Sequence, residues 1–105
     1  MIWKNRLCLF GFWDGMPYRS ITDKYEDFEK FTNQIEKQKV IRHIEGLDYG
    51  LSPTYSVDLF TGERFHAGIY EDGDFRFPID FLRYYKSRNI GIPYEYEDYL
   101  MDILE

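Results

Sequence analysis

The side chains of this chain best suited to chemistry are carboxylates close to its C-terminus. Residues 94–105 (YEYEDYLMDILE) hold five acidic side chains and no basic one, in a chain whose formal net charge is −6. Glu95, Asp98 and Asp102 recur at the spacing that places side chains on one face of a helix. Tyr94 lies near the edge of that stripe. Negative charge mixed with tyrosine favours docking of a basic partner, so we expect a binding surface and not a reaction centre.

A second acidic segment, residues 71–74 (EDGD), surrounds a glycine. Calcium loops place oxygen ligands at alternate positions and close with a Glu at the twelfth, and this segment does not follow that pattern. We therefore interpret it as a hairpin turn and expect Asp72 and Asp74 to assist the C-terminal stripe in binding a partner. The sequence predicts no metal site and no cofactor.

Catalysis would need a nucleophile or a base in a suitable setting. Cys8 lies in the most apolar stretch, Leu7–Phe10, which favours a buried and inert thiol. The two histidines, His43 and His66, lie in separate segments. A small enzyme that uses His66 as a general base with Asp58 or Glu71 is an alternative hypothesis.

Composition limits the partner class. One cysteine excludes an internal disulfide and favours a cytoplasmic protein. No stretch approaches the roughly 20 apolar residues of a membrane span. Direct nucleic-acid binding needs clustered Lys and Arg, whereas the basic patch of Lys37, Lys39 and Arg42 is flanked by acids and resembles a solvated face. The oligomeric state stays open.

These residues must be positioned by local structure. Residues 23–37 carry apolar side chains at helical spacing after a possible N-cap, Thr22, and predict a helix that breaks near Gln38. Residues 39–45 could continue it or form a short strand. An early strand is expected around 6–13, and residues 46–53 are expected to be a loop.

Further along the chain, residues 55–60, 64–70 and 75–77 predict a β-meander with Gly62 and Gly73 in its turns. Pro78 opens a predicted helix over 78–88, because its missing N–H costs nothing there. Pro93 opens a last helix whose Tyr96, Tyr99, Leu100 and Ile103 should face the core. The expected fold is a single α+β domain over residues 1–105, with a small antiparallel sheet and about three helices.

One segment also suggests a class of protein. Residues 62–100 contain a turn followed by a Phe-Pro helix start (residues 72–78), the pair Tyr84-Tyr85, and a closing Ile-Pro-Tyr-Glu at residues 92–95. In these features the chain resembles small bacterial toxin-immunity proteins, which share no common signature. The resemblance implies a bacterial, non-enzymatic, tight-binding role and assigns no individual residue.

Charge and resemblance together predict an acidic protein-binding inhibitor. The first hypothesis is an immunity protein that blocks a cognate toxin of the basic nuclease type. The alternatives are an acidic nucleic-acid mimic that inhibits a DNA-handling enzyme, and the small enzyme built on His66. The expected binding residues are those of the two acidic segments, Asp72, Asp74, Tyr94, Glu95, Asp98 and Asp102.

Overall fold

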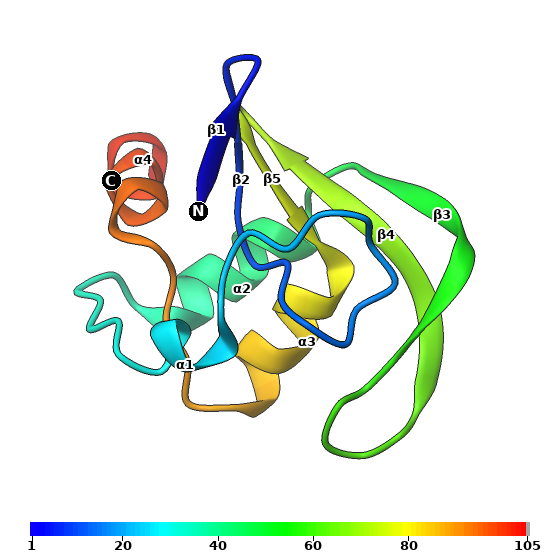
Figure 1. Ribbon diagram of the computed structural model, residues 1–105. Coiled ribbons are helices and arrows are strands. Elements are labelled where there is room, and N and C mark those ends of the chain that lie inside the picture. Colours follow the sequence, from blue (N-terminus) through cyan, green and yellow to red (C-terminus); the bar gives the residue numbers. More distant parts are fainter. Residues whose placement is uncertain (105) are drawn as a thin grey trace.

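A five-stranded mixed sheet forms the centre of the computed structural model, which describes residues 1–104 (Figure 1). Its strand order is β1-β2-β5-β4-β3. Neighbouring strands are antiparallel except β2 and β5, which run parallel. The strands are β1 (Ile2–Lys4), β2 (Leu7–Leu9), β3 (Tyr49–Val57), β4 (Arg64–Asp72) and β5 (Phe75–Pro78).

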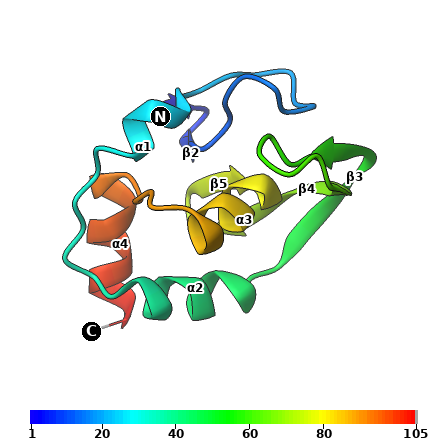
Figure 2. The same cartoon turned by 90° about the horizontal axis from the view of Figure 1, so that it is seen from below.

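Four helices complete the α+β domain that the sequence predicts. They are α1 (Tyr25–Phe28), α2 (Lys37–Glu45), α3 (Ile79–Ser87) and α4 (Tyr94–Leu104). The third helix packs on β4 and β5, and α2 packs against α3. Figure 2 shows α4 on one side of the molecule, next to the start of α2. None of the helices in residues 1–104 is long and apolar enough to cross a membrane.

Aromatic rings fill the space between the sheet and the helices. The ring of Phe10 is fully buried, 4.8 Å from Phe77, 5.1 Å from Tyr96 and 5.3 Å from Phe81. Each such ring removes roughly 150–250 Å² from water. A chain of 105 residues therefore builds a core without a disulfide, and its one cysteine, Cys8, is buried in that core.

The predicted helix over 23–37 is wrong for most of its length. Within that range only Tyr25–Phe28 and the last residue, Lys37, are helical; Thr22 is not the N-cap, and residues 31–36 form an irregular connection. The physical reason is tertiary: the backbone N–H groups of Gln34 and Ile35 donate to the Glu97 carboxylate, at 2.6 and 3.0 Å. These bonds to a distant side chain replace the helical ones. Residues 37–45 form a separate helix.

The sheet differs from the prediction at three places. Residues 6–13 contain only the short strand β2, because Gly11 adopts a φ of +81° and turns the chain away. Residues 49–53, expected as a loop, belong to β3, which has a bulge between Leu51 and Tyr55. The parallel pairing of β2 with β5 makes the sheet mixed instead of antiparallel.

Both C-terminal helices agree closely with the prediction. Pro78 is the N-cap of α3, and α4 begins directly after Pro93. Tyr96 and Leu100 are fully buried and Tyr99 packs partly against the core. Ile103 is an error of the prediction, because its side chain is 48% exposed near the end of α4, beyond the edge of the core.

Candidate partner-binding surface

The acidic stripe predicted from the sequence exists on α4. Glu95, Asp98 and Asp102 are exposed and lie on the side of the helix away from the buried Tyr96 and Leu100. Within residues 1–104, no Lys, Arg or His side chain forms an ion pair with any of the three carboxylates. Their negative charge is therefore directed to solvent.

Tyr94 marks the N-terminal end of this stripe and is 47% exposed. Its ring packs edge-on against Phe31, with centroids 5.1 Å apart. Its hydroxyl accepts a hydrogen bond from the backbone N–H of Thr32, at 3.3 Å. These two contacts hold the ring in place, so a partner could bury it at little cost in side-chain entropy.

The structure brings the β4–β5 turn up to the same helix. A Cβ atom at Gly73 would lie 2.8 Å from the Tyr99 hydroxyl, so turn and helix are in direct contact. Burial raises the pKa of Tyr99, and its hydrogen bond to Asp72 and the charges of Asp72 and Asp74 raise it further. Asp74 is exposed and extends the acidic surface.

Asp72 has a different place from the other predicted residues. Its side chain is 5% exposed and accepts hydrogen bonds from the Tyr96 and Tyr99 hydroxyls, at 2.7 and 3.0 Å. His43 Nε2 of α2 lies 2.8 Å from the same carboxylate. The carboxylate thus joins β4, α2 and α4, and it stabilises the position of α4 instead of facing a partner. The hydropathy pattern of β4 did not indicate that Asp72 would be buried in contact with α2 and α4.

Glu97 is a second carboxylate of this region that has a structural role, and the sequence analysis did not identify it. Its side chain is buried and accepts three hydrogen bonds from residues 33–35. Burial alone raises the pKa of Glu97, but bonds from Ile35 N–H, the Asn33 amide and Gln34 N–H outweigh it and hold the pKa below its usual range. The position of Glu97 one residue before Asp98, on the core side of the helix, could have indicated burial.

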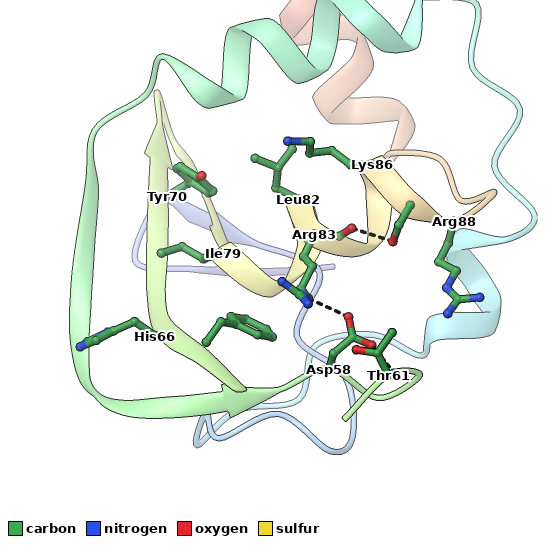
Figure 3. Close-up of a pocket in the computed structure, with 11 residues that line it drawn as sticks. Asp58, Thr61, His66, Tyr70, Ile79, Leu82, Arg83, Lys86 and Arg88 are labelled. Atoms are coloured by element: carbon green, nitrogen blue, oxygen red, sulfur yellow. Dashed lines mark hydrogen bonds and ion pairs between the residues drawn. The ribbon is translucent and has the colours of Figure 1, made fainter. Parts of the chain in front are cut away.

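A groove of about 750 Å³ lies on another part of the molecule, between α3 and the β3–β4 hairpin (Figure 3). Phe65, Tyr70, Ile79 and Leu82 give it an apolar lining. Its main cation, Arg83, lies over the Phe65 ring at 4.6 Å. Groove and acidic stripe share no residue.

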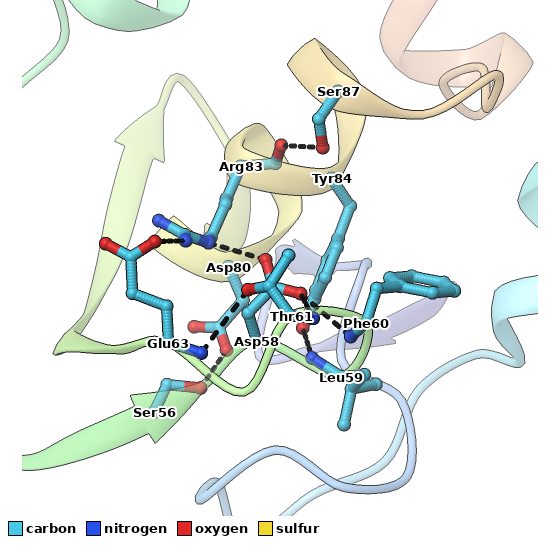
Figure 4. Close-up of polar contacts among 10 residues, drawn as sticks. All are labelled: Ser56, Asp58, Leu59, Phe60, Thr61, Glu63, Asp80, Arg83, Tyr84 and Ser87. Carbon is cyan, nitrogen blue, oxygen red and sulfur yellow. Dashed lines mark hydrogen bonds and ion pairs between the residues drawn. The ribbon is translucent and has the colours of Figure 1, made fainter.

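Arg83 of this groove already has two carboxylate partners. Arg83 Nε donates to Asp58 at 2.7 Å, and its Nη2 donates to Glu63 at 2.7 Å (Figure 4). The other oxygen of Asp58 accepts the backbone N–H groups of Phe60 and Thr61, at 2.8 and 2.9 Å. Burial alone raises the pKa of Asp58, but these bonds lower it to about 2. The network joins the hairpin loop to α3.

His66 lies at the edge of the groove and points away from its interior (Figure 3). Its ring packs near Tyr55 at 5.1 Å, and its Nδ1 lies 3.0 Å from the carbonyl oxygen of Ala67. The carboxylate of Asp58 is engaged by Arg83, so the pair of His66 with Asp58 does not form in this geometry. Within residues 1–104, no three His, Cys, Asp or Glu side chains gather in a way that could hold a metal ion.

The two surfaces differ in charge balance. The cations Arg83 and Lys86 of the groove are paired with carboxylates of the same chain, whereas the α4 stripe, beside an exposed tyrosine, forms no ion pair with the part of the chain that the structure describes. The stripe is therefore the better candidate for partner binding.

Comparison of the chain with protein-family models, with curated proteins and with solved structures gave no match.

Proposed function

We propose that this protein is an acidic protein-binding inhibitor, and specifically an immunity protein that neutralises a cognate bacterial toxin of the basic nuclease type. The observation that supports it is the exposure of Glu95, Asp98 and Asp102 on one face of α4, where none of the three forms an ion pair within residues 1–104. A nuclease presents a cleft of Lys and Arg to its phosphate substrate. An acidic helix that covers such a cleft excludes the substrate.

The mechanism separates the roles of charge and of aromatic contact. Uncompensated negative charge steers a basic partner and raises the association rate, towards about 10⁸ M⁻¹s⁻¹ at low salt. Tyr94, fixed by Phe31 and by the N–H of Thr32, supplies apolar contact area that slows dissociation. Asp74 adds charge at the β4–β5 turn.

The test begins with co-expression of the chain with the product of the neighbouring open reading frame, followed by measurement of association rates. Reversal of Glu95, Asp98 and Asp102 to Lys should slow association at least tenfold at about 50 mM salt, and less at about 300 mM, where screening is stronger. The reversed positions are exposed, so the fold should be retained, as checked by circular dichroism.

A matched control changes the net charge equally at another place. Asp14, Glu26 and Asp48 are also exposed, and their reversal to Lys adds the same charge outside the stripe. The proposal expects a much smaller effect from this control variant. Equal effects of both triple variants would show that only net charge matters, and unchanged binding by the stripe variant would reject the site.

A further inference from the structure

The last strand of the sheet, β3, has one edge that no other strand covers. It ends the order β1-β2-β5-β4-β3, and within residues 1–104 it pairs only with β4. Figures 1 and 2 show it on the outside of the molecule, on the side opposite α4. Residues Tyr49–Val57 therefore present backbone N–H and C=O groups along an edge that can pair with a further strand.

The side chains of β3 are unusual for a strand at the edge of a sheet. Four of its nine residues are large, apolar and about half exposed: Tyr49 (55%), Leu51 (60%), Tyr55 (51%) and Val57 (45%). No residue of the strand is charged. Edge strands are commonly protected by short length and by charge. The opposite edge, β1, has both, because it is three residues long and ends in Lys4. The edge of β3 is therefore the one suited to a partner.

The sequence of β3 is complementary to itself when two copies run antiparallel. About a two-fold axis at Pro53, Tyr49 lies opposite Val57 of the second copy, and Leu51 lies opposite Tyr55. Each large apolar side chain thus meets another, and such cross-strand pairs stabilise a sheet. Pro53 has no N–H to donate, but it lies on the axis, within the bulge between Leu51 and Tyr55. The two ladders on either side of the axis do not need its hydrogen bond.

Charges at the ends of the strand fit the same arrangement. Asp48 directly precedes β3, and Arg64 of β4 pairs with Val57 at the other end. Both are exposed, and neither forms an ion pair within residues 1–104. The guanidinium of Arg64 lies 4.7 Å from the centroid of the Tyr55 ring, so its side chain extends across β3. The two-fold axis brings the Asp48 end of each copy to the Arg64 end of the other.

We propose that two copies of this chain associate through β3, antiparallel about an axis at Pro53, into a dimer in which the two sheets are continuous. An isologous contact of this kind uses both β3 edges, so it closes at two copies. The acidic stripe of α4 lies on the other side of each copy, so the charge that dominates the net −6 stays away from the interface (Figure 2). No residue is shared with that stripe, and the inference does not depend on the proposed function.

Sedimentation velocity of the native chain, over about 5–500 μM protein at about 150 mM salt, tests the association. The mass should rise with concentration from that of one chain to twice that value and no further. Leu51→Lys should weaken the dimer about tenfold or more, because it places a charge in an apolar cross-strand pair. Ile21→Lys is the matched control, because Ile21 is 58% exposed in a loop outside β3, and should leave the dimer unchanged. Circular dichroism checks that both variants fold.

A charge exchange tests the two-fold register. Asp48→Arg and Arg64→Asp should each weaken the dimer several-fold, and the double variant should recover, because the exchanged charges meet again across the axis. A double variant as weak as the single ones would overturn the register. A native chain with the mass of one copy at every concentration would overturn the dimer and leave the edge to a strand of another protein. Equal weakening by Leu51→Lys and Ile21→Lys would remove β3 from the interface.

Discussion

Glu97 and Asp98 are neighbours in sequence with opposite roles. Asp98 is exposed and forms no ion pair within the described residues, whereas Glu97 is buried and accepts hydrogen bonds from Asn33, Gln34 and Ile35. A helix turns about 100° per residue, so adjacent side chains face different environments. One carboxylate therefore holds the connection between α1 and α2 against α4, and the next is available to a partner.

Replacing Glu97 by Gln should destabilise the fold by about 2–3 kcal/mol, because an amide would direct N–H groups towards backbone donors and lose charge-assisted bonds. Asp98→Asn is the matched control and should change stability by less than about 0.5 kcal/mol. Urea denaturation followed by circular dichroism measures both. Similar stabilities for the two variants would show that the Glu97 contacts contribute nothing.

At the scale of elements, the irregular connection of residues 31–36 depends on close packing against the chain that precedes α4. Asn33 Nδ2 donates to the carbonyl oxygen of Ile92 at 3.0 Å, and its Oδ1 accepts from Ile92 N–H at 2.8 Å. Gly91 N–H donates to the carbonyl of Phe28 at 2.9 Å, at the end of α1. The Asn33 side-chain amide and backbone groups thus bind the two segments to each other, in place of the helical bonds predicted for residues 23–37.

Gly91→Ala should therefore destabilise the protein by about 1–3 kcal/mol. A Cβ atom there would lie 2.5 Å from Asn33 Oδ1 and 2.7 Å from Phe31 Cβ, so the connection would have to move. Gly50→Ala is the control, because no atom lies within 4 Å of a Cβ at that exposed strand position. Thermal melting of both variants measures the difference in stability. Equal melting temperatures for Gly91→Ala and Gly50→Ala would contradict the packing argument.

The elements that the sequence predicted well are those fixed by neighbouring residues. The helix α4 follows Pro93 and repeats apolar residues at 3–4 spacing, and the turns at Gly62 and Gly73 adopt the positive φ that glycine permits. The parallel pairing of β2 with β5 joins residues more than sixty positions apart and left no local pattern. The acidic stripe was predictable because it depends on the spacing of residues within one helix. The burial of Asp72 was not, because it depends on contacts with His43, Tyr96 and Tyr99, which are distant in sequence.

At the scale of the whole molecule, charge is unevenly distributed. The formal charge of −6 arises mostly in residues 94–105, which have five acids and no base. Figure 1 shows α4 on one side of the molecule and the β3–β4 hairpin on the other. The hairpin side contains compensated ion pairs such as Arg83 with Asp58. A basic partner should therefore approach one face, and high salt should weaken that preference.

The same acids make the fold sensitive to low pH. Asp58 has a pKa of about 2 in the fold against 3.8 ordinarily, and the pKa of Glu97 is also lowered. A lowered folded-state pKa contributes stability that is fully present above the unfolded pKa and is lost as pH falls through the folded one. The melting temperature should hence be level near neutral pH and fall between about pH 4 and pH 2.

Asp58→Asn tests the source of that dependence. The variant should melt lower than the native chain at neutral pH, because Arg83 loses its buried partner, and its melting temperature should fall less steeply between about pH 4 and pH 2. Asp102→Asn removes an exposed acid that forms no ion pair within residues 1–104, and should keep the native slope. Parallel slopes for all three proteins would place the acid sensitivity in general charge repulsion, since the thirteen Lys and Arg remain charged when the acids are protonated.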